Sequence, residues 1–251
     1  MPLKQHPTDP DKMVYASRHY DIPQLQVVLR VKRMKVIPIK AEETEPWLLQ
    51  KHYAHRMCPI SYAFGAYIDN ILIGVVTYGV SASSTLRQGV CGKQWTDHVY
   101  ELNRLCCENE KNFASELVAK SMQMLPKPII VVSYADTEQG HVGYVYQATN
   151  FLYTGLSSKF KDPKVKGLEH QHHATYAHGL TNAEVIERYG KDNVYFVERA
   201  RKHRYVFFVG NKYQKRQMMN DLTYPVLPYP KGESKRYDAG GVVPTQELLF
   251  A

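Results

Sequence analysis

Hydrophobic residues recur along the chain at the spacings of strands and helices in alternation. Apolar runs, continuous or alternating, predict strands over residues 27–39, 62–67, 71–78, 99–107, 129–132, 151–155, 193–197 and 205–209. Helical spacing predicts helices over residues 41–56, 112–125, 140–150 and 181–189. This order of elements indicates an α/β or α+β fold, in which a central sheet carries helices on both faces.

Short local signals support several of these elements. Asp69 and Asn70 separate two strand-like runs and predict a hairpin turn. The run 129–132 consists of four consecutive apolar residues, which is typical of a strand buried on both faces. Thr181 and Glu184 form a capping box, which predicts the start of the last helix.

The composition is that of a folded globular chain. Its 251 residues are 44% hydrophobic and 22% charged, which excludes a disordered tail or a coiled coil. No run approaches the roughly 20 apolar residues that cross a bilayer, and residues 1–11 are polar, so we expect neither a membrane span nor a signal peptide. Four cysteines without a Cys-x-x-Cys pair indicate a reduced, cytoplasmic compartment.

Charge is unevenly distributed around a net value of +8. Residues 1–40 carry +5, residues 41–150 carry −3 and residues 151–251 carry +6. Residues 199–216 contain seven basic side chains, no acidic one and several aromatic rings, which favours contacts with DNA phosphates over a plain solvated surface. The seven basic residues are Arg199, Arg201, Lys202, Arg204, Lys212, Lys215 and Arg216.

Several common catalytic motifs are absent. The sequence has no P-loop, no Gly-x-Gly-x-x-Gly after a strand, no Gly-x-Ser-x-Gly and no His-Glu-x-x-His. The candidate chemistry instead follows the buried run, where Ser133 and Asp136 would project from the end of a strand. Asp136 could orient or deprotonate an amine, or it could simply cap the next helix. Tyr144 and Tyr153 could stack on a planar base or pack in the core.

Two other groups have both a functional and a structural interpretation. Strand alternation places Glu101 and Asn103 on one face and Arg104 on the other. An arginine among apolar neighbours needs an anion, either a carboxylate such as Asp136 or a ligand. His52, with His55 one helical turn later, could bind a metal, or could favour the helix C-terminus through the dipole. A second histidine group, in a polar segment, comprises His170, His172, His173 and His178.

Seven short motifs occur in one order and together carry a resemblance. They are His52-Tyr53 and residues 64–67 (FGAY), 101–105 (ELNRL), 133–136 (SYAD), 140–143 (GHVG), 146–150 (YQATN) and 202–205 (KHRY). Over residues 36–210 the chain resembles the bacteriophage Mom family of DNA-modification proteins. The resemblance implies a fold like that of the acetyl-coenzyme-A-dependent N-acetyltransferases, with a mixed central sheet and helices on both faces, followed here by a basic C-terminal extension.

The resemblance also implies an activity and a site. The expected reaction converts adenine in double-stranded DNA to N6-carbamoylmethyladenine, which protects phage DNA from restriction in the host bacterial cytoplasm. By matching position, the expected active-site residues are Tyr67, Arg104, Ser133, Asp136 and Tyr153. The expected iron ligands are His52 and Tyr53. Double-stranded DNA is the expected partner, and no membrane is expected. Whether the chain forms a homodimer is left open.

One departure concerns the cofactor. Acetyltransferases place a glycine-rich loop before the helix that holds the pyrophosphate of coenzyme A. Here residues 108–115 contain no glycine and two acids, so we do not expect acyl-coenzyme A to bind, and the carbamoylmethyl donor stays undetermined. Two alternatives stay open: an acyl-coenzyme-A-dependent N-acetyltransferase for a protein or small amine, and a DNA-binding protein without enzymatic activity.

We divide the chain into four parts on this basis. Residues 1–35 form an N-terminal arm and first strand, and residues 36–158 form an acetyltransferase-like catalytic core. Residues 159–222 form a basic, histidine-rich part that packs on the core, and residues 223–251 form a Pro/Gly-rich tail. Within the core, residues 79–92 are rich in Gly and Ser and predict a loop.

Overall fold

A computed structural model of the chain describes residues 33–232, apart from residues 82, 172 and 178. The expected N-terminal arm lies outside the described residues, as does the first part of the strand predicted over residues 27–39. The tail beyond residue 232 also lies outside them.

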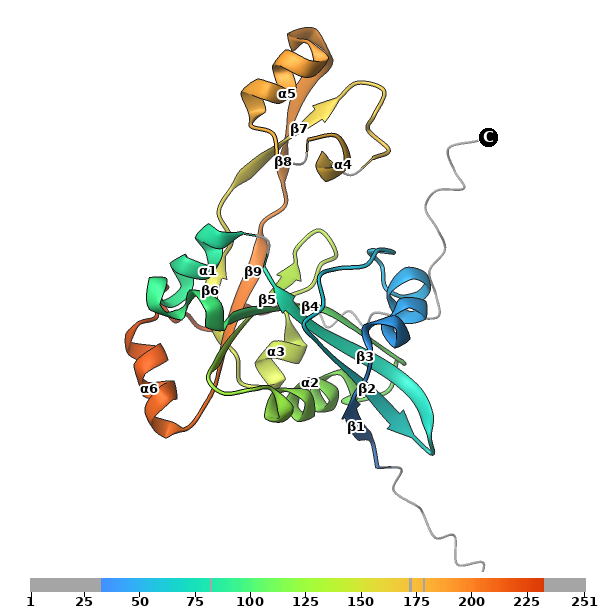
Figure 1. The fold of residues 1–251 in the computed structure, drawn as a ribbon, viewed down its shortest axis with the longest axis vertical. Helices are drawn as coiled ribbons and strands as arrows, with labels where there is room; N and C mark the ends of the chain where they lie inside the picture. Colours follow the sequence, from blue (N-terminus) through green and yellow to red (C-terminus); the bar gives the residue numbers. More distant parts are fainter. Residues whose placement is uncertain (1–32, 82, 172, 178, 233–251) are drawn as a thin grey trace, which may run out of the picture. The chain divides into compact units, whose positions relative to one another are not determined.

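The described chain is built on a seven-stranded sheet in the order β1-β2-β3-β4-β5-β9-β6 (Figure 1). Neighbouring strands are antiparallel except β4 and β5, which are parallel, so the sheet is mixed. The strands are β1 (Lys35–Pro38), β2 (Tyr62–Ile68), β3 (Ile71–Val80), β4 (Val99–Cys107), β5 (Ile129–Asp136), β6 (Leu152–Leu156) and β9 (Lys202–Val209).

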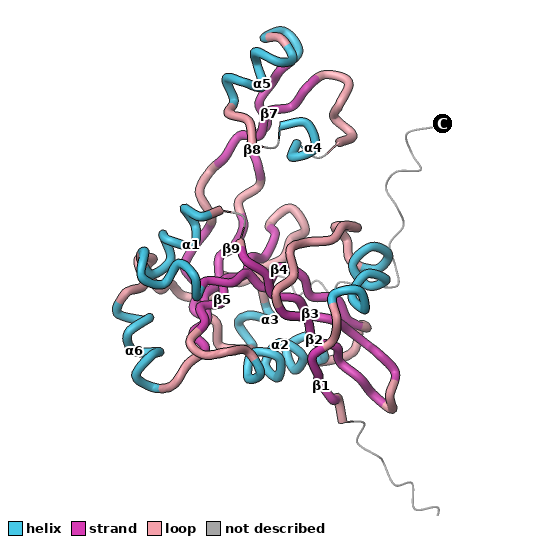
Figure 2. The backbone as a smooth tube through the Cα atoms, viewed as in Figure 1, coloured by secondary structure: helices cyan, strands magenta, loops and turns pink. Residues whose placement is uncertain are grey.

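Helices cover both faces of this sheet (Figure 2). Leu117 of α2 and Tyr146 of α3 pack on one face. On the other face, Val90 of α1, Met218 of α6 and Trp47 of a short π-helix pack in two further clusters. The elements are α1 (Ser84–Cys91), α2 (Phe113–Met124), α3 (Tyr144–Ala148), α6 (Lys212–Asn220), the π-helix (Trp47–Lys51) and 3-10 helices (Ala41–Thr44 and Lys93–His98). The predicted fold class, a mixed α/β sheet with helices on both faces, is confirmed.

Two of the predictions for the first half of the core were wrong. The helix predicted over residues 41–56 is a 3-10 turn followed by a π-helix that ends at Lys51. Pro46 stands between the two with helical φ and ψ but without an amide hydrogen to donate, so it interrupts the regular hydrogen bonding of an α-helix. The loop predicted over residues 79–92 contains α1, whose start is capped by Ser83: its Oγ accepts from the Leu86 amide at 3.1 Å.

Residues 158–201 form a small lobe inserted between β6 and β9. Its strands β7 (Phe160–Val165) and β8 (Val194–Arg199) pair antiparallel, and between them lie α4 (His173–Ala177), α5 (Asn182–Tyr189) and a 3-10 turn (Lys191–Asn193). The capping box of Thr181 with Glu184 is present at the start of α5, as predicted. The lobe has its own core of Val165, Tyr176, Ala177 and Val185.

The structure divides the C-terminal third differently from the sequence. β9 lies between β5 and β6 in the sheet, so residues 202–209 belong to the core that we expected to end at residue 158. The start of the expected tail is also attached to this core. The Leu227 amide donates to the Tyr153 carbonyl at 2.9 Å, and the Tyr229 hydroxyl donates to the Phe151 carbonyl at 2.8 Å.

Candidate active site

A cavity opens where β4 and β5 separate. The two strands are paired only from Val99 with Ile130 to Leu102 with Ser133; beyond that point β4 stays paired with β3 and β5 with β9. The space between them is a cavity of about 500 Å³, a size within the range of small-molecule sites. Its walls come from β4 and the loop that follows, the end of β5, residues 140–148, the start of β9 and the segment after the π-helix.

A β-bulge in β4 decides which side chains meet in this cavity. Thr77 of β3 pairs with Arg104 and the next residue, Tyr78, pairs with Leu102, so Asn103 is an extra residue without a partner across the strands. The bulge shifts the alternation by one position. Arg104 therefore shares the face of Glu101, and the prediction from simple alternation that they face opposite ways was wrong.

Glu101 is a site residue that sequence reasoning did not select. It lines the cavity, and burial raises the pKa of its carboxyl group above the usual value, although a hydrogen bond from Ser81 and the charges of Arg104 and Lys202 act in the opposite direction. A carboxylate that holds its proton more tightly is suited to accept one near neutral pH. The sequence does show an acid three residues before an arginine on a strand. Simple alternation places the two side chains on opposite faces, and only the bulge brings them to the same face.

Arg104 lines the cavity as predicted, with an unused hydrogen-bond donor. Its Nη1 donates to the Asn103 carbonyl at 2.6 Å, whereas its Nε is buried and has no hydrogen-bond partner among the described residues. The ion pair with Asp136 that the sequence left open is not among its contacts. A buried donor on a cation without a partner is energetically unfavourable unless a ligand completes the site.

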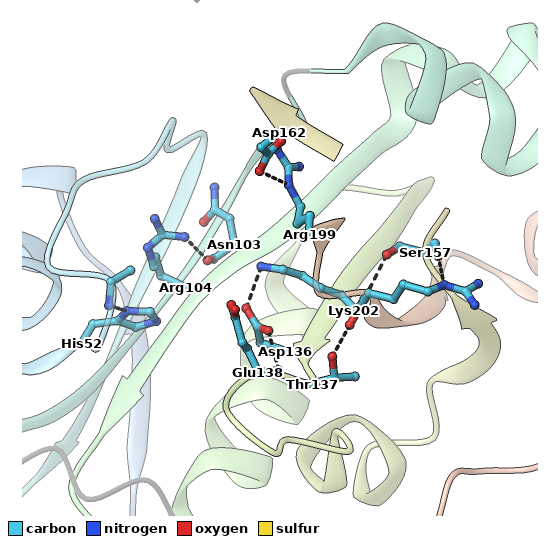
Figure 3. A network of polar contacts seen from close by, with 12 residues as sticks. His52, Asn103, Arg104, Asp136, Thr137, Glu138, Ser157, Asp162, Arg199 and Lys202 are labelled. Atoms are coloured by element: carbon cyan, nitrogen blue, oxygen red, sulfur yellow. Dashed lines mark hydrogen bonds and ion pairs between the residues drawn. The ribbon is translucent and has the colours of Figure 1, made fainter. Parts of the chain in front are cut away.

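Asp136 lines the cavity at the end of β5, opposite Arg104 (Figure 3). Its Oδ2 lies 2.9 Å from Nζ of Lys202, and its Oδ1 accepts from the Glu138 amide at 3.0 Å. The carboxylate therefore caps a turn, not the helix that the sequence suggested, and it also lines the cavity. The pair fixes Lys202, the first residue of β9, at the cavity wall.

The other active-site residues implied by the resemblance lie outside the cavity lining. Ser133 is fully buried, and its hydroxyl donates to the Leu102 carbonyl at 3.1 Å, where it ties β5 to β4. Tyr153 is buried, and its hydroxyl lies 2.9 Å from Nδ1 of His203. Tyr67 is in β2, in register with Lys35 on the edge strand. The structure thus brings together Arg104 and Asp136 but not Tyr67, Ser133 and Tyr153.

Aromatic side chains line the remaining part of the cavity. His52 and Tyr53 stack with their ring centroids 4.4 Å apart, and Tyr53 meets His141 edge to face at 6.3 Å. Tyr53 and Tyr144 are partly exposed, with 39% and 41% of their surface accessible. Rings at a cavity entrance can stack on a flat aromatic ligand. Tyr144 had been singled out for this role from the sequence.

His52 and Tyr53, the expected iron ligands, both line the cavity. Burial, followed by the charge of Arg104, lowers the pKa of His52 to about 3, and its Nδ1 accepts from the Ala54 amide at 3.0 Å. His55 lies beyond the helix end at a φ of 42°, so the two histidines do not share a helical face. Within the described ranges, no group of three or more His, Cys, Asp and Glu side chains could hold a metal ion. His172 and His178 lie outside the described residues.

The loop before α2 is the part of the cavity wall that corresponds to the cofactor loop of acetyltransferases. Glu108, Glu110 and Lys111 line the cavity there, and Lys51 lies 2.6 Å from one oxygen of Glu108. Two cations therefore stand beside the two carboxylates, and this wall is close to neutral. The prediction that acyl-coenzyme A does not bind rests on the absence of a glycine-rich loop, whose backbone amides would hold the pyrophosphate.

The predicted DNA-contacting cations occupy different environments. Arg199 forms a bidentate pair with Asp162 at 2.8 and 2.5 Å. Arg201 donates from Nε to the Ser157 carbonyl at 2.6 Å and is partly exposed. Arg204 is only 8% exposed. The exposed cations of α6 are Lys212, Lys215 and Arg216.

The contacts of Arg204 are internal. Its Nε donates to Oγ1 of Thr154 and its Nη2 to the Thr154 carbonyl, both at 3.0 Å, and its guanidinium lies 3.4 Å from the centre of the Tyr224 ring. These contacts tie β9 to β6 and to the segment after α6. A guanidinium held in this way is not available to a phosphate.

Comparisons with known proteins agree with the motifs. Residues 33–231 match the Mom protein family. The methylcarbamoylase Mom of Escherichia phage Mu is 26% identical over 214 residues, which cover 77% of this chain and 84% of that protein. In the part of the chain that the structure describes, no helix is both long and apolar enough to cross a membrane.

Solved structures similar to this chain are acetyltransferases. One from Bacillus subtilis, in complex with CoA, has a TM-score of 0.38 and 13% identity, and covers 70% of this chain and 98% of its own. A spermidine/spermine N-acetyltransferase from Vibrio cholerae has a TM-score of 0.40 and 10% identity, and covers 73% and 99%. Since the family match extends over most of the residues, the chain belongs to the Mom protein family.

Proposed function

We propose that this chain is a phage DNA-modification transferase that converts adenine to N6-carbamoylmethyladenine in double-stranded DNA and thereby protects the DNA from host restriction. Membership of the Mom family and the likeness to the methylcarbamoylase of phage Mu support this reaction. The observation that carries the proposal is the cavity itself, where a half-buried carboxylate of raised pKa and an arginine with an unused donor line the same space.

The target base must leave the duplex to react. Adenine N6 is a poor nucleophile and lies inside the base stack, so extrusion of the nucleotide costs a few kcal/mol. Stacking on aromatic side chains offsets part of this cost. In our proposal Tyr53, His141 and Tyr144 at the cavity hold the extruded adenine, and the cavity of about 500 Å³ encloses it together with the donor group.

Glu101 is the proposed proton acceptor. The N6 nitrogen forms a bond to the methylene carbon of the donor, the bond from that carbon to its leaving group breaks, and the leaving group departs with the electron pair. One N6 proton passes to the Glu101 carboxylate. Asp136, which is held by Lys202 and the Glu138 amide, orients the amine. The cavity of this chain supplies a base, an orienting carboxylate and an arginine for this reaction.

Arg104 is the proposed anchor for the donor. Its buried Nε would donate to an anionic or carbonyl oxygen of that molecule and so acquire the partner that it lacks. The loop before α2 has no glycine-rich cradle for a pyrophosphate, which disfavours a coenzyme A thioester as the donor and also disfavours an ordinary N-acetyltransferase activity.

The proposed DNA contacts come from the basic residues that the structure leaves accessible. Arg199, Arg201 and Lys202 lie at the cavity end of β9, and the exposed cations of α6 follow its other end. The eight residues of β9 separate these two groups by about 25 Å, a span that one duplex could bridge. The buried Arg204 is not part of the proposed set.

The test is chemical analysis of DNA from cells that produce the protein. Plasmid DNA co-expressed with the wild-type chain should contain, after hydrolysis to nucleosides, a deoxyadenosine bearing a carbamoylmethyl group, detectable by mass spectrometry. Glu101→Gln should lower the amount of this product at least about a hundredfold. Glu116→Gln, which makes the same change on α2 in a half-exposed pair with Lys120, should retain it. Unmodified adenine with soluble wild-type protein would refute the proposal.

A further inference from the structure

The ribbon formed by β7 and β8 exposes an unusual amount of apolar surface. In β8, Tyr195, Phe196 and Val197 are 38%, 42% and 43% exposed, and Phe160 at the start of β7 is 58% exposed. Single exposed apolar residues are common on proteins, but Phe160, Tyr195 and Val197 share one face of this two-stranded ribbon. Nothing in the described lobe covers them, because its core lies around Val165.

The pairing of the strands sorts these residues onto two faces. Directly paired residues share a face, so Phe160 lies beside Arg199 and Lys164 lies beside Tyr195. The opposite face carries Val165, which packs in the core of the lobe. The outward face therefore presents two aromatic rings, each with a basic side chain as its cross-strand neighbour.

The charge of the ribbon favours an anionic partner. Residues 159–166 and 194–201 contain six basic and two acidic side chains, a net charge of +4. One of the acids, Asp162, is already paired with Arg199 at 2.5 Å. Cations that alternate with exposed rings suit a polyanion that also offers flat or apolar surface, which is the chemistry of DNA.

The base of the ribbon is fixed beside the cavity. The Ser157 amide donates to the Lys202 carbonyl at 2.8 Å, and the Lys202 amide donates to Oγ of Ser157 at 2.9 Å, so the two strands leave the sheet together. Lys202 itself reaches the cavity and pairs with Asp136 (Figure 3). Thr137, the next residue, donates from its hydroxyl to the Arg201 carbonyl.

A second cavity lies between the ribbon and the loop that follows β5. It measures about 510 Å³ and is lined by both strands of the ribbon and by Glu138, two residues beyond Asp136. The ribbon base is thus in contact with the loop that forms one wall of the cavity. A duplex that offers a base to the cavity would meet the ribbon at this point.

We propose that the β7–β8 ribbon enters the major groove of duplex DNA next to the adenine that is modified, with Phe160 and Tyr195 against base edges and Lys164 and Arg199 near phosphates. The major groove, about 12 Å wide, admits a two-stranded ribbon, whereas the minor groove is about half as wide. This proposal rests on the proposed function and adds the element that recognises the DNA around the target.

The experiment measures binding of the full chain to a short fluorescent duplex over a series of NaCl concentrations. Lys164→Ala with Tyr195→Ala should weaken binding at least about tenfold and lower the slope of log Kd against log salt by about one. The matched control, Lys35→Ala with Ile71→Ala, removes one exposed cation and one exposed apolar side chain at the opposite edge of the sheet, and should bind like the wild type.

Two further measurements complete the test. Phe160→Ala, at a position that is 58% exposed, gives a second variant, and circular dichroism with thermal unfolding verifies that each variant is folded. Methylation of guanine N7, a major-groove atom, should interfere with wild-type binding near the target adenine and lose its effect in the ribbon variants.

The outcomes separate this inference from the proposed function. If the wild type modifies adenine and the folded ribbon variants bind DNA as tightly as the control, the ribbon proposal is wrong and the proposed function stands. If the wild type modifies no adenine but the ribbon variants lose DNA binding, the function fails and the ribbon contact stands. If the substitutions dissociate a dimer and leave DNA binding unchanged, the ribbon is instead an interface between copies of the chain.

Discussion

At the scale of single residues, the neighbours of a side chain decide its role. Arg104 and Arg204 both stand on central strands among apolar residues, and the sequence suggests a functional role for each, in the active site for Arg104 and in DNA contacts for Arg204. Thr154 and Tyr224 surround the guanidinium of Arg204, whereas Nε of Arg104 is buried without a partner at a cavity. Sequence motifs identified Arg104 as a site residue, but only the packing shows that Arg204 has a structural role.

Glu101 shows what the sequence could not reveal at this scale. Alternation along a strand is reliable only while every residue has a partner on the next strand, and the extra Asn103 breaks it. A bulge leaves no clear mark in residue types. The carboxylate that the sequence favoured, Asp136, does line the cavity, but the carboxylate with the raised pKa was overlooked.

The raised pKa of Glu101 predicts how activity depends on pH. Because the base must be deprotonated, the rate should fall on acidification, with a midpoint above the ordinary carboxyl value of 4.5. Single-turnover rates of adenine modification between pH 5 and 8 would give this midpoint. Glu101→Asp should keep a pH-dependent rate at lower activity. The residual rate of Glu101→Gln should not fall on acidification. A wild-type rate that does not change over this range would contradict the role.

Arg204 leads to a prediction about stability. Arg204→Ala removes two hydrogen bonds from a charged group and a cation–π contact, so the free energy of unfolding should fall by about 2–4 kcal/mol. Urea denaturation measures this change. Arg216→Ala, on the exposed surface of α6, should change stability by less than about 0.5 kcal/mol. Equal stability of the two variants would show that Arg204 is not held as described.

At the scale of elements, strongly patterned segments were predictable and weakly patterned ones were not. The strand 99–107 and the helix 112–125 were predicted to within one residue at each end, and Asp69 and Asn70 adopt the positive φ values of a tight hairpin turn. α1 was missed because it lies in the Gly/Ser-rich segment 79–92 and depends on the Ser83 cap and on packing.

Strand β7 was missed for a different physical reason. Its sequence alternates charged residues with Phe160, Pro163 and Val165, and proline is normally excluded from central strands. A two-stranded ribbon has only edge strands, where proline is tolerated. The sequence therefore could not distinguish this strand from a polar loop.

Gly143 supports a prediction at the scale of elements, because it begins α3 and lines the cavity. Its φ is 80°, and a Cβ at this position would lie 2.5 Å from the ring of the buried Tyr205. Gly143→Ala should therefore lower the free energy of unfolding by about 3 kcal/mol, from backbone strain and overlap together. Gly167→Ala has a similar φ of 84° with no atom within 4 Å, so only the strain of about 1–2 kcal/mol should appear.

Thermal and urea unfolding of both glycine variants would measure these effects. A loss for Gly143→Ala no larger than that for Gly167→Ala would show that the α3 wall can shift away from Tyr205. Adenine modification by Gly143→Ala should also fall, because residues 140–148 carry the aromatic wall that we propose for the extruded base.

At the scale of the whole molecule, the sequence predicted the class of fold but not the division of the chain. The separation of β4 and β5 creates the cavity, and it depends on which strands pair, a long-range property that local patterns do not encode. The basic C-terminal third, which looked like one extension, supplies both the central strand β9 and the separate lobe.

This division predicts that the lobe can be removed without loss of the sheet. Ser157 and Lys202 are already hydrogen-bonded as the facing ends of β6 and β9, so replacing residues 159–200 with Asn-Gly should close a two-residue hairpin. Because the lobe core of Val165, Tyr176, Ala177 and Val185 is separate from the other clusters, the shortened chain should unfold within a few degrees of the wild type. Its cavity residues remain, yet adenine modification in duplex DNA should fall at least about tenfold because the ribbon is gone. Thermal unfolding and nucleoside mass spectrometry on the same preparation would check both halves of the prediction. An insoluble product would show that the lobe stabilises the sheet, and a fully active one would show that the cavity recognises duplex DNA without the ribbon.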